Sequence, residues 1–491
     1  MYKKNLSIFL IILSGFILNV LSVQIVGSSF RYLQGSLNAS VEQISYVMSA
    51  SLIAEVIIIP FTGWLARLIS TRLLFLISLG GFLLASLGCA LSNNFYLMVF
   101  FRGLQGFFGG AMLPLMTASI YTLFKSKEIP FVLSIAATFG VSSIALGPVL
   151  GGILTEYLSW RWMFFYNIPI GIIIFFLAYF FIDLKDSEKE LIKNIDYKGI
   201  FFLALALISF LLFIEEGERR DWFNSNFILF SSCLSISFLI LFINYEIKTK
   251  YPVIDLNIFL NRNFFIGCIN VLVFSITLYV PIFLLPIFLG EIKLMDPVDI
   301  GIVISTLGIA WMLSGPFVGY LLKLIGARLV VVIGCLLIGY GAFLQINITV
   351  DYIFQNLFYS QLLKGLGAQF LWIGNQYICL ASIPLNKVKN ASAMFNLILR
   401  LGAATFIAMS SNFLTKWQKM YSSEISSYGS SSFYFFNNDN FEEQNLYSLF
   451  IQREGMIMAL NNITYVSMWT VIIPIILMFY VKTKGKEKLL Y

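Results

Sequence analysis

Long apolar stretches alternate with short polar segments along almost the whole chain. Each stretch holds roughly 20 mostly apolar residues, the length that a helix needs to cross a bilayer. The pattern predicts fourteen membrane-spanning helices, over residues 6–27, 44–65, 73–92, 95–122, 130–155, 162–182, 198–214, 225–245, 264–289, 300–322, 329–348, 352–382, 390–413 and 461–481. The first stretch lacks a small-residue cleavage site, so we interpret it as a retained helix rather than a signal peptide.

The composition excludes a soluble enzyme and a nucleic-acid-binding protein. The 491 residues are 59% hydrophobic and only 12% charged, whereas soluble domains carry about a quarter charged residues. Histidine is absent, which removes histidine catalysis, most zinc sites and any histidine proton relay. The five cysteines lie in apolar stretches without metal-ligand spacing, so we interpret them as packing residues. We expect no metal and no cofactor, and proton chemistry falls to carboxyl groups.

The basic residues are distributed unevenly between the predicted loops. An even number of crossings places both termini on one side, and most of the 32 Lys and Arg residues then fall on that side. Positive charge accumulates on the cytoplasmic side of membrane proteins. The sequence therefore predicts a multi-pass protein of the cytoplasmic (inner) membrane, with both termini in the cytoplasm.

A short internal repeat relates the two ends of the chain. Residues 60–74 read PFTGWLARLISTRLL and residues 316–330 read PFVGYLLKLIGARLV, with eight of fifteen positions identical. Many secondary transporters are built from internal repeats, with the substrate site between two halves. A chance match is the alternative, but it does not explain why Gly, Arg and the loop position recur together. We predict an all-α polytopic membrane protein in which 1–182 and 251–491 form six-helix bundles and 183–250 inserts a linker and two helices.

Glycines line one face of the fifth predicted span. Gly140, Gly147 and Gly151 fall almost on one line of the helix at 100° per residue, and Gly152 widens the stripe. Pro148 adds a kink point within it. Such a stripe lets another helix approach closely, and ordinary small-residue packing is the alternative to a special role.

These glycines resemble the antiporter motif of the major facilitator superfamily. Directly after them, WRWMFFYNIPIG at 160–171 is similar to the signature of its fourteen-helix drug:proton antiporters of EmrB/QacA type. The segments 102–106 (RGLQG), 63–67 (GWLAR) and 396–402 resemble further motifs of that family. The resemblance implies the major facilitator fold and the export of hydrophobic or amphipathic compounds in exchange for protons.

Two positions depart from that family and direct attention to another residue. Ser22 stands where the family often has an acidic residue, and Ser70 replaces the usual glycine of a loop motif. Among the acidic residues, Glu55 alone lies near the middle of a predicted span, where a charge costs at least ~2.5 kcal/mol. We predict that Glu55 takes up and releases protons. A structural hydrogen bond to a neighbouring helix is the alternative.

Three basic residues also lie within predicted spans. Arg102 is expected to face a central cavity and act on the protonation of the embedded carboxyl group, whereas capping of backbone carbonyl groups is the alternative. For Lys364 and Arg400, substrate contact and snorkelling or packing stay open. We assign Arg400 to the predicted substrate cavity together with polar residues within spans: Gln24, Gln105, Asn270, Asn375, Gln376 and Asn396.

The two repeated loops carry matched glycines and basic residues. We predict two cytoplasmic gates that open and close as the halves move, formed by Gly63, Arg67, Arg72, Gly319, Lys323 and Arg328. Positive-inside topology is the alternative for these charges. The polar segment 414–460 is expected outside, as a flexible loop or, in a Gram-negative bacterium, as a docking surface for a periplasmic adaptor that works with an outer-membrane channel.

The residues together predict a proton-coupled exporter of hydrophobic or amphipathic toxic compounds that works by alternating access. Its partners are small substrates, protons and the bilayer, and no nucleic acid is expected. One alternative is a transporter of a dedicated solute such as a metabolite, siderophore or lipid-like molecule. A polytopic membrane enzyme is a weaker alternative, because it would need clustered His, Asp or Glu at a membrane face, and none is evident. The sequence also lacks the glycine-rich loop of ATP-driven transporters.

Overall fold

Helices make up all the regular secondary structure of the computed structural model. It describes residues 2–124, 128–184, 196–249, 254–349, 354–384, 388–433 and 441–482. No β-strand occurs in these ranges, which agrees with the predicted all-α class.

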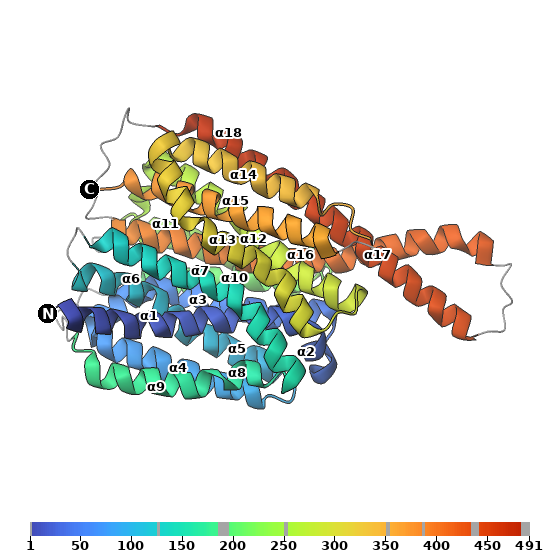
Figure 1. Ribbon diagram of the computed structural model, residues 1–491, viewed down its shortest axis with the longest axis horizontal. Coiled ribbons are helices and arrows are strands. Elements are labelled where there is room, and N and C mark those ends of the chain that lie inside the picture. The colour runs from blue at the N-terminus through green and yellow to red at the C-terminus, as the bar shows by residue number, and fades with distance from the viewer. Residues whose placement is uncertain are drawn as a thin grey trace.

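The N-terminal half comprises the elements up to α9, which run side by side along the long axis of the molecule (Figure 1). Its elements are α1 (Tyr2–Gln24), η1 (Gly27–Ser29), α2 (Phe30–Leu37), α3 (Val41–Ile69), α4 (Thr71–Leu91), α5 (Phe95–Gly110), α6 (Met112–Leu123), α7 (Ile129–Tyr157), α8 (Trp162–Phe165) and α9 (Asn167–Phe181). Local sequence sets the start of α3: Ser40 and Gln43 form a reciprocal capping box that satisfies two backbone N–H groups.

A pair of helices follows, and the C-terminal half comes after it. The pair consists of α10 (Tyr197–Glu216) and α11 (Asn226–Glu246), with η3 (Trp222–Asn224) between them. The C-terminal half comprises η4 (Leu256–Leu260), α12 (Arg262–Ile287), η5 (Phe288–Ile292), α13 (Pro297–Ile325), α14 (Ala327–Phe343), α15 (Phe354–Ala381), α16 (Val388–Phe433), α17 (Phe441–Thr470) and α18 (Ile472–Tyr480).

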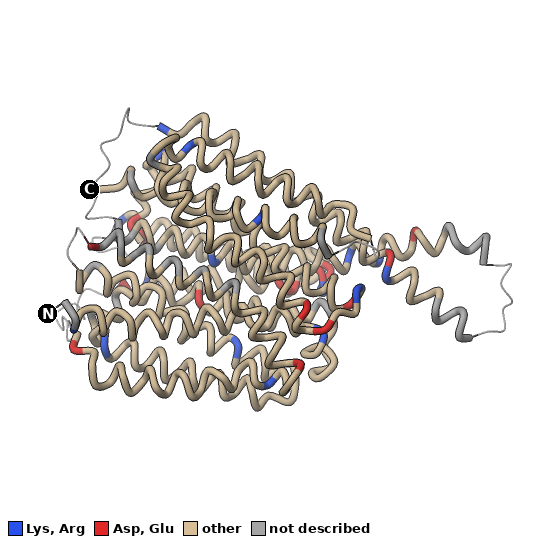
Figure 2. Tube along the Cα trace, in the orientation of Figure 1, with Lys and Arg blue, Asp and Glu red and all other residues tan. Residues whose placement is uncertain are grey.

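Ten segments of the described chain are long and apolar enough to cross a membrane, and α14 is a shorter apolar helix. Charged residues lie mostly towards the two ends of the helices, with few along the middle of the body (Figure 2). Both properties are those of a multi-pass membrane protein. The number of fourteen crossings stays a prediction.

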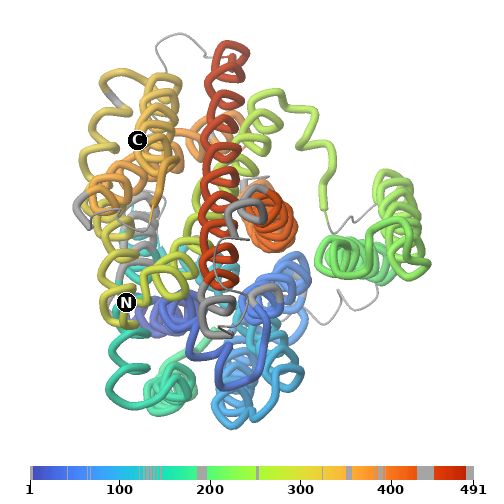
Figure 3. Tube along the Cα trace, turned by 90° about the vertical axis from the view of Figure 1, so that its right-hand side faces the viewer, coloured from blue at the N-terminus to red at the C-terminus, as the bar shows by residue number. Residues whose placement is uncertain are grey.

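The largest contacts between the two halves are formed by two pairs of helices. Helix α7 packs against α13, and α3 packs against α16. The pair α10–α11 stands to one side of the body (Figure 3) and reaches it through contacts of α10 with α3 and α16. The start of α1 and the end of α18 lie at the same end of the molecule (Figure 1), as expected for an even number of crossings.

The prediction of a loop over 414–460 is wrong for the described residues of that segment, 414–433 and 441–460, which are helical. Helix α16 continues to Phe433 and α17 begins at Phe441, and the two project from the body as a helical extension (Figure 1). Residues 414–428 contain neither Gly nor Pro, so nothing in them stops a helix. At 46 residues, α16 is about 69 Å long, more than the roughly 40–45 Å thickness of a bilayer.

Side-chain contacts hold the base of the extension together. Gln418 donates a 3.3 Å hydrogen bond to the Gln452 carbonyl group. A Cβ atom added at Gly455 would lie 2.4 Å from Ser422 Oγ, so glycine permits this close approach of α16 and α17. Because these segments are polar, the sequence gives no indication that the two helices pack against each other.

Candidate functional site

An ion pair joins the two halves in the interior of the molecule. Glu55 of α3 and Arg400 of α16 are 1% and 9% exposed, and Glu55 Oε2 lies 3.2 Å from Arg400 Nε. The structure thus brings together two residues that the sequence singled out separately. A buried pair is expensive to desolvate, and removing either partner leaves the other charge uncompensated.

The second carboxylate oxygen of Glu55 is also bound. Asn19 of α1 donates its side-chain N–H to Glu55 Oε1 at 3.0 Å. A Cβ atom at Gly109 would lie 2.0 Å from Asn19 Oδ1, and one at Gly110 would lie 2.8 Å from the Glu55 Cα atom. Glycine at these two positions of α5 therefore makes room for the amide and the carboxylate. Tyr279 of α12 is buried within electrostatic range of both charges of the pair.

Arg102 is fully buried inside the N-terminal half. Its guanidinium donates to the carbonyl groups of Val47 and Ser22 at 2.8 and 3.2 Å. It also donates to Gln105 Oε1 at 2.6 Å and to Ser51 Oγ at 3.2 Å. No carboxylate in the described residues forms an ion pair with it. The arginine thus ties α1, α3 and α5 together by capping backbone carbonyl groups, and its predicted effect on protonation stays a prediction.

Neutral groups complete the network around Arg102. Gln105 donates to the hydroxyl groups of Ser22 and Ser86 at 2.9 and 2.7 Å. Asn167 donates to the same two hydroxyl groups at 3.2 and 3.3 Å. Ser22 is therefore part of a neutral hydrogen-bonded cluster. Sequence reasoning did not assign a role to Asn167, whose burial only the packing of α9 against α1 and α4 reveals.

The C-terminal half has its own buried polar groups. Asn270 donates to Asn375 Oδ1 at 3.0 Å, and Asn375 donates to the Gly267 carbonyl group at 2.9 Å. Lys364 of α15 is buried and donates to Gln345 Oε1. Each half thus has a buried cation that donates to a glutamine side chain, Arg102 in the N-terminal half and Lys364 in the C-terminal half.

The other predicted cavity residues do not converge on one point. Gln24 is buried against Gly147, and its Oε1 has no described hydrogen-bond partner. Gln376 and Asn396 are half-buried, and Asn396 donates to the Ser392 carbonyl group of its own helix at 2.8 Å. Their role in substrate binding stays a prediction.

The glycine stripe of α7 faces two different helices. Cβ atoms at Gly147 and Gly151 would lie 2.7 Å from Gln24 Cβ and 2.1 Å from the Ile25 carbonyl oxygen, and Gly140 faces Phe16 of the same helix α1. A Cβ atom at Gly152 would instead lie 2.3 Å from the Pro297 carbonyl oxygen of α13.

The contact between α7 and α13 is reciprocal. A Cβ atom at Gly301 of α13 would lie 2.4 Å from the Pro148 carbonyl oxygen of α7. The segments 148–152 and 297–301 both read Pro-Val-x-x-Gly, so each helix presents its glycine to the other's proline carbonyl group. The backbones of the two halves touch here, and a side chain on either glycine would separate them.

The repeated loops have matching contacts in each half. Arg72 at the start of α4 donates to the Tyr179 carbonyl group of α9 at 2.5 Å, and Arg328 at the start of α14 donates to the Val481 carbonyl group after α18. Each arginine therefore binds within its own half rather than across the loops. Gly63 and Gly319 have open space beside them. The side chains of Arg67 and Lys323 lie outside the described residues, and the gate function stays a prediction.

The two loops share a backbone geometry but differ in the residue that adopts it. Ser70 has φ +86° and ψ 149°, and its counterpart in the repeat, Gly326, has φ +81° and ψ 160°. Only glycine adopts this region without strain, which costs on the order of 1–3 kcal/mol for other residues. Ser70 gains a 3.3 Å cap bond from Leu73 N in return.

Replacing Ser70 by Gly is expected to stabilise the protein by about 1 kcal/mol. The released strain exceeds the few tenths of a kcal/mol lost with the cap and the entropy that glycine adds to the unfolded chain. The thermal unfolding temperature in detergent should rise. Ser70→Ala, which keeps the strain and loses the cap, should lower it, as should Gly326→Ser. Equal falls for Ser70→Gly and Ser70→Ala would show that the cap dominates.

The arrangement of helices is similar to that of two solved membrane transporters. The bacterial homologue of the human lysosomal transporter Spinster, in an inward-facing, unoccupied conformation, has a TM-score of 0.63 and 12% identity, covering 98% of this chain and 99% of that chain. The nucleoside transporter NupG has a TM-score of 0.61 and 14% identity, covering 96% and 100%. At these identities the likeness shows the fold alone.

The chain belongs to the Major Facilitator Superfamily, which residues 12–407 match. It is 31% identical to the colistin resistance protein EmrB of Acinetobacter baumannii, over 86% of this chain and 83% of that protein. It is 28% identical to the probable multidrug resistance protein EmrY of Escherichia coli, over 80% and 77%. It is 27% identical to the fatty acid resistance protein FarB of Neisseria gonorrhoeae, over 82% and 78%.

Proposed function

We propose that this transporter exports hydrophobic or amphipathic toxic compounds across the cytoplasmic membrane in exchange for protons. The observation that carries the proposal is the buried ion pair of Glu55 with Arg400, because it connects the halves through a group that can bind a proton. The names of the relatives, which refer to colistin, multiple drugs and fatty acids, support amphipathic substrates. Both termini lie in the cytoplasm in this proposal.

Proton binding acts on the contact between the halves. The charged Glu55 attracts Arg400 and holds α3 against α16. A proton on Glu55 removes that attraction. The halves are then free to separate at this contact, so that the transporter becomes accessible from the other side of the membrane. Asn19 holds the carboxyl group in place in either state, since its N–H donates to a charged or a neutral oxygen. Arg102 and its hydrogen bonds keep α1, α3 and α5 moving as one unit.

The test is substrate-triggered dissipation of a pH gradient in proteoliposomes. The substrates are a panel of lipophilic cations, uncouplers, detergents and a fatty acid. Glu55→Gln is expected to abolish the dissipation, because glutamine keeps the shape and the contact with Asn19 but binds no proton. Glu424→Gln, on the exposed surface of the extension, is the matched control and should behave as wild type.

The outcomes separate the coupling residue from the transport reaction. Dissipation by wild type and not by Glu55→Gln supports the proposal. Equal dissipation by both would place coupling at another group. Substrate uptake without any proton movement in wild type would overturn proton exchange, and a response to a single compound would favour a dedicated solute.

A partner protein fits the same proposal. In a Gram-negative bacterium, a periplasmic adaptor and an outer-membrane channel would carry the exported compound onward. The helical extension of α16 and α17 projects from the end opposite the chain termini (Figure 1), and it carries exposed apolar side chains at Met420, Leu449 and Phe450. It is the surface that we propose for the adaptor.

A further inference from the structure

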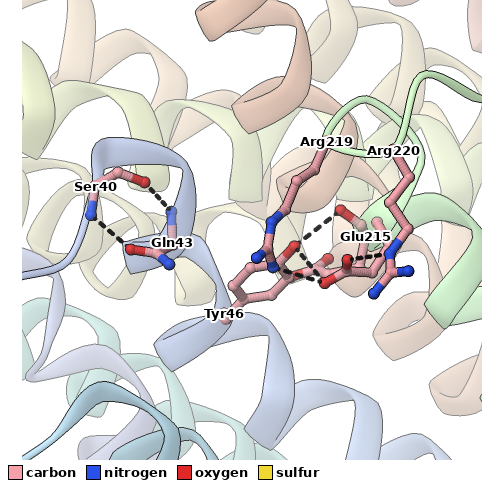
Figure 4. A network of polar contacts seen from close by, with 7 residues as sticks. Ser40, Gln43, Tyr46, Glu215, Arg219 and Arg220 are labelled. Atoms are coloured by element: carbon pink, nitrogen blue, oxygen red, sulfur yellow. Dashed lines mark hydrogen bonds and ion pairs between the residues drawn. The ribbon is translucent and has the colours of Figure 1, made fainter.

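A polar cluster fastens the pair α10–α11 to the body of the transporter. Tyr46 of α3 donates to the Glu215 carbonyl oxygen at 3.1 Å and lies 3.2 Å from Glu216 Oε1 (Figure 4). Ser49, one turn further along α3, donates to Glu215 Oε1 at 2.5 Å. On the other side, Asn412 of α16 donates to the Ile214 carbonyl group at 2.9 Å. The last turn of α10 is thus bound by both halves.

The two carboxyl groups of this turn have different surroundings. Glu216 is paired with Arg219 at 3.4 Å and with Arg220 at 2.8 Å (Figure 4). The Glu216 carboxylate raises the pKa of Arg219, so that cation stays charged. Glu215 is 7% exposed and forms no ion pair within the described residues. Its side chain has the Ser49 hydroxyl group as its hydrogen-bond partner.

Three physical effects act against a negative charge on Glu215. Burial without a paired cation is unfavourable for a carboxylate. Glu216, the adjacent residue, adds the repulsion of a second carboxylate. The C-terminal end of a helix carries partial negative charge, and both residues lie in the last turn of α10. Tyr46, Arg219 and Arg220 are the other titratable or charged groups of the cluster, and both arginines are engaged by Glu216.

We propose that Glu215 is a proton-binding site of this transporter, placed on the helix pair that stands beside the two halves. With a proton bound, Glu215 is neutral and keeps α10 on α3 through Ser49. Loss of that proton leaves two adjacent carboxylates at the contact and loosens it. The inference does not rest on the proposed function, because the bound proton can be observed without transport.

The test is the infrared spectrum of the full-length protein in lipid, recorded as a difference between pH about 6 and 9. Exposed carboxyl groups are already charged throughout this range, so the carbonyl stretch of a protonated carboxyl reports buried groups. We expect wild type to lose a protonated-carboxyl component as the pH rises. Glu215→Gln should lack that component, and Glu216→Gln should retain it.

Thermal unfolding of the same samples gives a second readout. A folded state that holds a proton more tightly than the unfolded chain is favoured at low pH and loses that stability as the pH rises. Wild type and Glu216→Gln should therefore lose stability between pH about 6 and 9, and Glu215→Gln should lose less. A difference spectrum that Glu215→Gln leaves unchanged would overturn the proposal.

Ser49→Ala keeps the test decisive if Glu215→Gln does not fold. The Ser49 hydroxyl donates to the carboxylate and so favours the charged form. Its removal should make the protonated component persist to higher pH. An unchanged pH dependence in Ser49→Ala would show that the titrating group lies elsewhere.

Discussion

Replacing Arg400 by Ala is expected to destabilise the protein by about 3–5 kcal/mol, because it leaves Glu55 charged, buried and unpaired. Replacing both residues by Gln should cost far less, since no charge then remains to be compensated and both side chains can still form hydrogen bonds. The measurement is the free energy of unfolding of the purified transporter, determined for wild type, Arg400→Ala and the double variant Glu55→Gln/Arg400→Gln.

The control for this comparison is an ion pair nearer the surface. Arg453→Ala removes one partner of a partly exposed pair, in which Arg453 Nη2 lies 3.5 Å from Glu454 Oε1, and should change stability by no more than about 1 kcal/mol. If Arg400→Ala were as mild as Arg453→Ala, the inter-half pair would not be formed in the membrane. A double variant as unstable as Arg400→Ala would show that Arg400 acts through its packing.

Replacing Gly152 by Ala is expected to open the contact between α7 and α13. The new Cβ atom would lie 2.3 Å from the Pro297 carbonyl oxygen, a distance that backbone atoms cannot relieve without the helices moving apart. Overpacking of this kind costs about 1–3 kcal/mol. If only the arrangement in which α7 and α13 touch bears that cost, the equilibrium constant for separation of the two helices rises by about 5- to 150-fold.

The opening can be followed by thiol labelling. The variant Val298→Cys places a thiol beside the contact, in a background in which the exposed Cys233 is replaced by Ser. This thiol should react faster when Gly152→Ala is added to that background than without it. Gly140→Ala is the matched control, because its Cβ atom would meet the Phe16 ring at 3.3 Å and a side chain can yield. Equal labelling rates in all three would mean that this contact does not control access.

Sequence reasoning found individual residues more readily than their partners. Glu55 was identified because it lies in the middle of an apolar stretch, and Arg400 because a charge is rare in a span. Their ion pair could not be predicted, since the rotation of a helix about its own axis is set by the helices packed around it. Asn19 and Tyr279 escaped notice for the same reason, because a polar residue in a span carries no signal of what it faces.

The other differences between prediction and structure arise where helices extend beyond the predicted spans. Glu215 lies just beyond the predicted span 198–214, where the sequence gives no indication of burial, although contacts with α3 and α16 bury this end of α10. The helical extension was missed because its residues are polar, and its two helices pack mainly on each other. In contrast, the repeat of 60–74 in 316–330 anticipated a structural similarity, since Arg72 and Arg328 each bind a carbonyl group near the end of the last helix of their own half.

The unbroken course of α16 gives the transporter a lever arm. The helix runs from Arg400, at the ion pair, to its end at Phe433 in the extension without a described break. At 1.5 Å per residue, these 33 residues span about 50 Å. A tilt of about 10° around Arg400 would therefore displace the far end by roughly 9 Å. In the proposed mechanism, a protein bound there would move with α16 when Glu55 gains or loses a proton.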